Sequence, residues 1–370
     1  MAMPRSLSTT ANDKLYEILK SIEHLVHFAH WAYLNDDGVE FRMYAAELKG
    51  SLNARYLRIE TPFRKRGSLL APSTTHVHLG IRTSDTLVLA FPGYIFPIAW
   101  EDILQPTQFR GFLANVWTDI SFGLTKIDWL DADLPNVFVH KGFLLAFNNF
   151  LQDDKLLSYI NQLRRDTSRQ DFEKIEICGH GLGGALATLC ALWCKIKWPD
   201  KDITCVTLGS PRVGNQHFVE EFTRRNIRCY RLVEQYDPIP TVPDRYSQAV
   251  SIKIPPSHPG FSIRKRKYQH AGESLSLWQH VSGEIILRDF DPPGVNDEEI
   301  AGDLSIPVDI GLRLGWWAPY WMWRGPRILW NLWHHNPSHY AKMVWGVMDQ
   351  EMDQEMEQEM HRVRNRILRA

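Results

Sequence analysis

The segment Glu176–Ala187 holds the residues whose types and spacing point most directly to chemistry. Apolar, strand-like residues lead into a glycine-rich turn, and small residues typical of a helix follow it. This order is typical of a nucleophile elbow, in which the central residue of a tight turn attacks the substrate. The central residue here is Gly181, flanked by Gly179 and Gly183. A phosphate-binding P-loop is the alternative, but it ends in Lys and Ser or Thr, which are absent here.

The elements expected around this turn alternate between strand and helix. Short apolar runs predict the strands Val77–Ile81, Thr86–Phe91, Lys174–Cys178, Ile203–Leu208, Ile227–Val233 and Glu284–Arg288. Helical spacing of apolar residues predicts helices over Asp13–Leu34, Gly142–Leu163, Gly183–Ile196 and Gln216–Arg225. Such alternation favours an α/β fold, a mostly parallel sheet with helices on both faces.

The composition excludes several classes of protein. The chain has 370 residues, 44% of them hydrophobic and 23% charged, which excludes a collagenous or wholly disordered protein. The formal net charge of −1 provides no global field that would recruit nucleic acid. The five cysteines are an odd number without the spacing of a zinc site, so buried free thiols are expected.

At the elbow the sequence resembles the class 3 (fungal-type) triacylglycerol lipase family. The family pattern Gly-His-Ser-Leu-Gly-Gly is matched by residues 179–184 except at its serine. Further blocks similar to the family's, in the family's order, are Phe28–Tyr33, Phe91–Tyr94, Trp100–Asp102, Val139–Phe143, Leu208–Asn215 and Tyr268–Glu273. The resemblance covers roughly residues 15 to 345. It implies an α/β-hydrolase fold and an acyl ester or lipid as the ligand.

The resemblance also implies the other members of a catalytic triad. Asp237, which follows an apolar strand, matches the position of the acid. The family's histidine stands in a short His-Tyr context, which favours His339 and leaves His334 and His335 as alternatives. His270 lies in a block that the family uses structurally. The chain order of nucleophile, acid and histidine agrees with α/β-hydrolases.

An oxyanion hole requires two backbone N–H groups that face the developing negative charge. The resemblance assigns these groups to Leu182, directly after the nucleophile position, and to Tyr94, after Gly93. Here the sequence departs from the family, because Pro92 replaces an Arg and Tyr94 replaces a Ser or Thr. No metal or cofactor is expected.

Glycine at position 181 decides what the chain can do as written. Without a hydroxyl, no acyl-enzyme can form through residue 181, so serine hydrolysis is expected to be impaired or absent. Three origins remain open: a natural pseudoenzyme, a deliberate removal of serine, or an enzyme in which Asp237 and His339 activate a water. The functional alternative to a lipase-like hydrolase is a non-catalytic module that binds lipid or protein.

The expected domain organisation is a disordered N-terminus (1–12), one lipase-like domain (13–345) and a charged, Met- and Gln-rich helical tail (346–370). A Trp-rich insertion at about 303–333 either covers the substrate cleft or contacts a membrane surface peripherally. The basic run Arg264–Lys267 suits a solvated loop or anionic lipid. Without a recognisable signal peptide, a cytoplasmic location is expected, with possible membrane association.

Overall fold

A computed structural model describes residues 9–33, 56–63, 73–82, 85–93, 124–130, 134, 136–166, 172–241, 243, 268–280, 282–289 and 332–350. Its main sheet has eight strands in the order β1-β2-β3-β6-β7-β9-β11-β12. They are β1 (Tyr56–Phe63), β2 (Ser73–Ile81), β3 (Thr86–Phe91), β6 (Lys174–His180), β7 (Asp202–Leu208), β9 (Arg228–Glu234), β11 (Glu273–Gln279) and β12 (Ile285–Arg288). The inner strands β3, β6, β7, β9 and β11 are parallel, while β1, β2 and β12 pair antiparallel at the edges.

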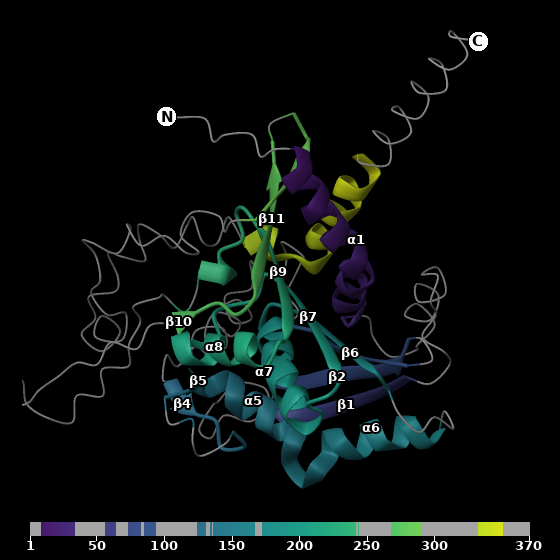
Figure 1. Cartoon of the computed structure of the whole chain (residues 1–370), viewed down its shortest axis with the longest axis vertical. Coiled ribbons are helices and arrows are strands. Elements are labelled where there is room, and N and C mark those ends of the chain that lie inside the picture. Colours follow the sequence, from purple (N-terminus) through teal and green to yellow (C-terminus); the bar gives the residue numbers. More distant parts are fainter. Residues whose placement is uncertain are drawn as a thin grey trace, which may run out of the picture.

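Helices cover both faces of this sheet (Figure 1). One face carries α1 (Thr9–Trp31) and the C-terminal helix 337–350, whose residues share one hydrophobic cluster. The other face carries α5 (Lys141–Leu151), α6 (Lys155–Asp166), α7 (Leu182–Lys197) and α8 (Gln216–Arg224). The described helices and strands confirm the predicted α/β class, and the strand–turn–helix at Gly181 has the arrangement of an α/β-hydrolase.

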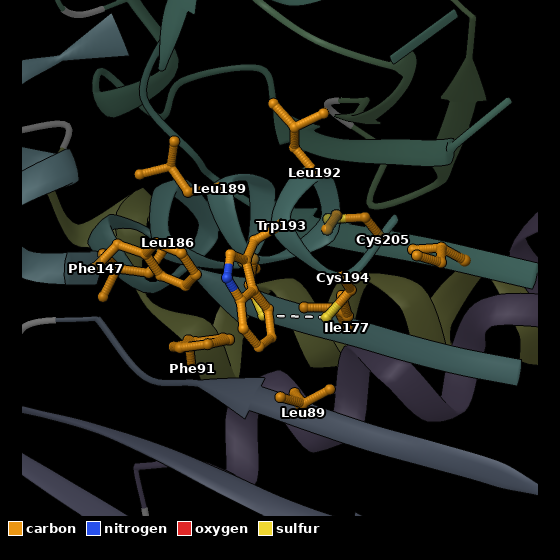
Figure 2. Packing of buried hydrophobic residues seen from close by; sticks show 14 of the residues in the cluster. Leu89, Phe91, Phe147, Ile177, Leu186, Leu189, Leu192, Trp193, Cys194 and Cys205 are labelled. Atoms are coloured by element: carbon orange, nitrogen blue, oxygen red, sulfur yellow. Dashed lines mark hydrogen bonds between the residues drawn. The ribbon is translucent and has the colours of Figure 1, made fainter. Parts of the chain in front are cut away.

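Alternate residues of the parallel strands fill the two cores. Leu89 and Ile177 point toward α5 and α7, whereas their neighbours Val88 and Cys178 point toward α1 and the C-terminal helix. A period of two residues is what a strand buried on both faces requires. Figure 2 shows the α7 side of this packing, where Trp193 belongs to the same buried cluster as residues of β3, β6 and α5.

A second, four-stranded sheet has the order β10-β8-β5-β4. Its strands are β4 (Leu124–Lys126), β5 (Phe138–His140), β8 (Gly214–Asn215) and β10 (Tyr268–Gln269). Asn215 joins this sheet to α8, because its Oδ1 accepts hydrogen bonds from the backbone N–H groups of Phe138 and Phe218. The 3-10 helices are η1 (Gln152–Asp154), η2 (Ile239–Thr241) and η4 (Leu332–His335).

The structure differs from the expected elements at two places. The first helix begins at Thr9, inside the stretch 1–12 that was expected to be disordered. The helix expected over 142–163 is two helices, α5 and α6, because Asp153 in η1 has φ 53°, which the regular helix does not allow. Asp tolerates this left-handed conformation better than most residues. The Trp-rich block up to 331, the basic run 264–267 and the tail beyond residue 350 lie outside the described residues.

The described residues include all five cysteines and allow a search for membrane-spanning helices. All five cysteines are free and buried, which confirms the prediction. Burial raises the pKa of the Cys178, Cys190 and Cys205 thiols, with a hydrogen bond to Cys229 the larger cause at Cys205, so these groups stay protonated. Within the described ranges, no helix combines the length and apolar character needed to span a bilayer.

Candidate active site

The glycine-rich turn joins the end of β6 to the start of α7 at the carboxyl edge of the parallel sheet. Gly181 has φ 56° and ψ −122°, a backbone conformation that favours glycine. Its N–H donates to Leu208 O at the end of β7, and its carbonyl accepts from the N–H groups of Gly184 and Ala185 in the first turn of α7. The residue is therefore fixed at the centre of the turn, as the elbow interpretation requires.

The flanking glycines are required by crowding. A Cβ at Gly179 would overlap the backbone of Gly183, and a Cβ at Gly183 would overlap the carbonyl of Phe91 and lie 2.6 Å from Pro92. The end of β3 is therefore pressed against the start of α7. This brings the strand end that precedes Tyr94 beside the elbow.

The structure pairs Asp237 with His335. His335 Nδ1 lies 2.8 Å from Asp237 Oδ2, and both side chains are almost fully buried. The Nε2 atom of His335 lies 2.7 Å from the point that a Cβ at residue 181 would occupy. Gly181, His335 and Asp237 thus stand in line, with Nδ1 of the imidazole facing the carboxylate and Nε2 facing the turn.

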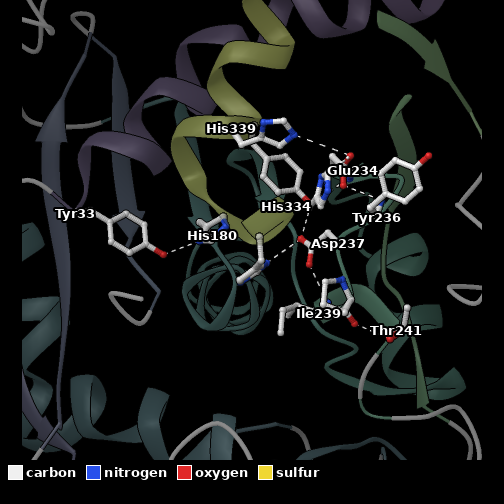
Figure 3. Close-up of polar contacts among 12 residues, drawn as sticks. Tyr33, His180, Glu234, Tyr236, Asp237, Ile239, Thr241, His334 and His339 are labelled. Carbon is white, nitrogen blue, oxygen red and sulfur yellow. Dashed lines mark hydrogen bonds and ion pairs between the residues drawn. The ribbon is translucent and has the colours of Figure 1, made fainter. Parts of the chain in front are cut away.

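The assignment of His339 as the partner of Asp237 is therefore wrong. His339 Nε2 faces Glu234 Oε1 at 4.0 Å, and His334 Nδ1 faces the same oxygen at 3.2 Å (Figure 3). The reason is the direction in which each histidine side chain points from its helix. Asn336 accepts from the N–H of Ser338 and caps the C-terminal helix, so the chain changes direction between His335 and His339.

The environment of Glu234 disfavours its charged form. Burial raises the pKa of this carboxyl to about 8, and the charge of Asp237 adds to the rise. Burial lowers the pKa values of His334 and His339. These directions all favour the neutral forms of the three groups.

Two residues that sequence reasoning missed position the pair. The Tyr340 hydroxyl donates to Asp237 Oδ2 at 2.6 Å and accepts from the Glu234 N–H at 3.1 Å. Burial, and then the charge of Asp237, raises the pKa of this phenol, so it remains a donor. Gly209 has φ 54°, and a Cβ there would overlap Asp237 Oδ2 and lie 2.9 Å from His335 Nδ1. The His-Tyr context that favoured His339 contained Tyr340 as the useful signal.

Hydrogen bonds also fix the loop that follows Asp237. Asp237 Oδ1 accepts from the Ile239 N–H at 2.8 Å. His270 bonds the carbonyl of Pro240 at 2.8 Å, and Arg212 donates to the carbonyl of Pro243 at 2.7 Å. His270 is therefore structural, as predicted, because it supports the loop that carries the candidate acid.

Tyr33 connects the elbow to the strand end opposite it (Figure 3). Its hydroxyl accepts from the Gly93 N–H at 2.8 Å, so its proton is left to donate to His180 Nδ1 at 2.6 Å. The His180 ring in turn lies against His335, with ring centroids 4.3 Å apart. Tyr94 itself lies outside the described residues, whereas Leu182 begins α7, where the first N–H groups have no intrahelical partner.

Residues 179, 181 and 184 also have the Gly-x-Gly-x-x-Gly spacing of dinucleotide-binding turns. The structure favours the elbow instead. In a dinucleotide site the space over the turn receives a pyrophosphate, whereas here the imidazole of His335 stands over Gly181 with Asp237 behind it.

Residues 109–247 match the family model described as lipase (class 3). Toxin TseL of Vibrio cholerae is 31% identical over 111 residues, which are 30% of this chain and 16% of that protein. Secreted mono- and diacylglycerol lipase 2 of Gibberella zeae is 32% identical over 118 residues, 29% of this chain and 28% of the relative. Phospholipase A1-Igamma2, chloroplastic, of Arabidopsis thaliana is 28% identical over 192 residues, 42% of this chain and 35% of the relative.

The chain thus spans about a third or less of these curated relatives. Among solved structures, the lipase from Rhizopus microsporus var. chinensis aligns with a TM-score of 0.46 and 21% identity, over 77% of this chain and 80% of that one. Lipase II from Rhizopus niveus aligns with a TM-score of 0.48 and 19% identity, over 77% and 87%. Residues 109–247, which include the elbow and Asp237, therefore carry the sequence pattern of the class 3 lipases.

Proposed function

We propose that this chain is a lipase-like hydrolase scaffold for acyl esters of lipids, with Gly181 at the position of the nucleophile, His335 as the base and Asp237 as the acid. One observation carries the proposal: Gly181, His335 Nε2 and Asp237 Oδ2 stand in line at the carboxyl edge of the sheet. In a serine hydrolase the imidazole takes the proton of the nucleophile, and the carboxylate holds the imidazole in the required tautomer and orientation.

The hydrogen bonds support this division of roles. Asp237 Oδ2 faces His335 Nδ1 and accepts from the Tyr340 hydroxyl, so the carboxylate is held on two sides. With Nδ1 protonated toward Asp237, Nε2 carries a lone pair toward residue 181. A lone pair at that point is what a general base needs to accept the proton of a serine hydroxyl.

The protein as written lacks the step that this arrangement serves. Gly181 has no side chain, so no ester bond can form between substrate and residue 181. The five cysteines do not replace the serine, because all are buried, and Cys178 contacts the cluster on the α1 side of the sheet. We therefore propose that serine-type hydrolysis is absent, which leaves binding of an acyl ester or lipid as the retained property.

The second candidate is a non-catalytic module that binds lipid or protein. It is favoured by the same contact: His335 Nε2 stands where a side chain at residue 181 would begin, and its ring packs on His180. The names of the lipase and phospholipase relatives support a lipid as the ligand in either case. Peripheral membrane contact through residues 303–333 and the cytoplasmic location stay predictions.

Labelling by a fluorophosphonate probe tests the proposal. The protein as written is expected to give no adduct on the peptide that spans residues 177–186, while Gly181→Ser is expected to give one at residue 181. Gly181→Ala is the matched control, because it carries the same Cβ without a hydroxyl. Labelling of the unaltered protein at another residue of the site would contradict the proposed assignment, as would a folded Gly181→Ser protein that does not react.

A further inference from the structure

A second polar cluster lies beside the proposed site and takes no part in it. Glu234 ends β9, His334 lies in η4, and His339 lies in the first turns of the C-terminal helix. One carboxylate oxygen and one nitrogen from each imidazole all lie within 4.8 Å of one another. Figure 3 shows the three side chains converging beside Tyr236.

Hydrogen bonding within the described residues does not account for this convergence. His334 Nδ1 is buried and 3.2 Å from Glu234 Oε1, yet its geometry is not that of a hydrogen bond. Glu234 uses its other oxygen, Oε2, to accept from the Tyr236 N–H at 2.7 Å. A buried imidazole nitrogen and a buried carboxylate oxygen are therefore close together, and nothing else described satisfies the nitrogen.

Two imidazoles and one carboxylate are a donor set suited to divalent transition metals, zinc above all. Ligands at about 2.1 Å from a tetrahedral ion stand about 3.4 Å apart. The distance from His334 Nδ1 to Glu234 Oε1, 3.2 Å, is close to this spacing, and His339 Nε2 lies 4.0 Å from the same oxygen. Because all three ligand atoms lie within 4.8 Å of one another, shifts of at most about 1.4 Å complete the site. Both histidine side chains are about a quarter exposed, while Glu234 is almost fully buried, so the cluster lies at the boundary of the buried region.

We propose that Glu234, His334 and His339 form a binding site for one divalent transition-metal ion, of which Zn²⁺ is the chosen probe, with water as the remaining ligand. The site goes beyond the proposed function, since it uses neither Gly181 nor the contact between Asp237 and His335. The sequence predicted no metal site, because Glu234 lies about a hundred residues before His334 and His339 and no short motif joins the three.

The position of the site gives metal binding a structural consequence. His334 precedes His335, and His339 precedes Tyr340, whose hydroxyl donates to Asp237. An ion held by the two histidines would join η4 to the C-terminal helix and to the end of β9. Binding only to the folded protein raises its stability by mass action.

The test is zinc binding to the full-length chain after removal of metals with a chelator, measured by calorimetry and by the thermal midpoint. We expect one Zn²⁺ per chain and a higher midpoint that a chelator reverses. His339→Ala is expected to weaken zinc binding by about tenfold or more, since loss of outer-shell partners alone has effects of this size. Alanine suits a helix, so this variant should fold. Glu234→Gln removes the carboxylate and should act in the same way.

His217→Ala is the matched control. His217 also lies 3.0 Å from a glutamate, Glu220, but the described residues place no third ligand beside this exposed pair. Its loss should leave zinc binding unchanged. The proposal is overturned if the unaltered chain binds no zinc stoichiometrically, or if His339→Ala, folded by circular dichroism, binds zinc as tightly as the unaltered chain. Should Glu234→Gln fail to fold, His339→Ala decides.

Discussion

His335 Nε2 lies 2.7 Å from the point where a Cβ atom at residue 181 would stand. Real Cβ atoms essentially never approach another atom this closely, so any side chain at residue 181 requires the imidazole to move. A shift on the order of 1 Å would change the overlap into the hydrogen-bond spacing of a serine hydroxyl and its base. The position of the His335 imidazole therefore decides whether residue 181 can carry a side chain, and whether a serine there could form a hydrogen bond with the imidazole.

The first prediction concerns stability. Gly181→Ala should destabilise the fold by more than Gly283→Ala. Both glycines have positive φ, 56° and 92°, which costs a residue with a side chain about 1–3 kcal/mol. At Gly283 a Cβ would meet nothing within 4 Å, whereas at Gly181 it would also displace His335. Denaturant midpoints of the two variants measure the difference. An equal loss of stability in the two variants would show that displacing the His335 imidazole costs no free energy.

The second prediction concerns Tyr340. In a Gly181→Ser background, Tyr340→Phe should lower kcat for a soluble ester several-fold and alter its pH profile, because Asp237 loses one of its hydrogen bonds. The stability loss should be about 1 kcal/mol. Tyr236→Phe is the control, since Tyr236 is 52% exposed and contributes only its backbone N–H to Glu234. An unchanged pH profile in Tyr340→Phe would contradict a positioning role for Tyr340.

The third prediction concerns acid stability. Burial lowers the pKa of His140 to about 3, and its Nδ1 accepts from the N–H groups of Gly142 and Phe143 at the start of α5. A histidine in the unfolded chain has a pKa near 6.5. As the pH falls below that value, the unfolded chain binds a proton at His140, whereas the folded chain keeps His140 neutral. The stabilisation is present above about pH 6.5 and is lost toward pH 3, by about 1.4 kcal/mol per pH unit.

His140→Asn isolates this effect, because asparagine can cap the helix but does not titrate. Unfolding in denaturant at about pH 7 and about pH 5.5 measures it. The variant should lose less stability over this interval than the unaltered protein. Equal losses would mean that other groups, such as the buried His180 and His270, cause the acid sensitivity.

Much of the fold could be predicted from the sequence, because its signals are local. The inner strands β3, β6, β7 and β9 are short segments rich in apolar residues, and α7 follows a glycine-rich turn. The strands β1 and β11 were not predicted. β11 alternates Leu275 and Leu277 with serines, and the stretch is short for a periodicity argument. The break between α5 and α6 was missed because two residues with positive φ, Asp153 and Asp154, leave little trace in composition.

The candidate site was predicted in part. Gly181 and Asp237 follow strands whose carboxyl ends meet at one edge of the sheet, so their proximity follows from topology. The choice among His334, His335 and His339 could not be made in this way. Neighbouring residues in a helix point about 100° apart, so a difference of one position decides which imidazole reaches Asp237. The end of η4 and the cap at Asn336 set that phase, and both depend on tertiary packing.

Hydrolysis of a soluble p-nitrophenyl ester by Gly181→Ser, alone and combined with His335→Ala or His339→Ala, tests the central claim most directly. The single variant should hydrolyse the ester. Adding His335→Ala should remove nearly all of this activity, because the base is lost, while adding His339→Ala should leave most of it. Each double variant is compared with Gly181→Ala, which carries no nucleophile. The account is contradicted if the His335→Ala double variant stays as active as Gly181→Ser, or if the activity is lost with His339 instead.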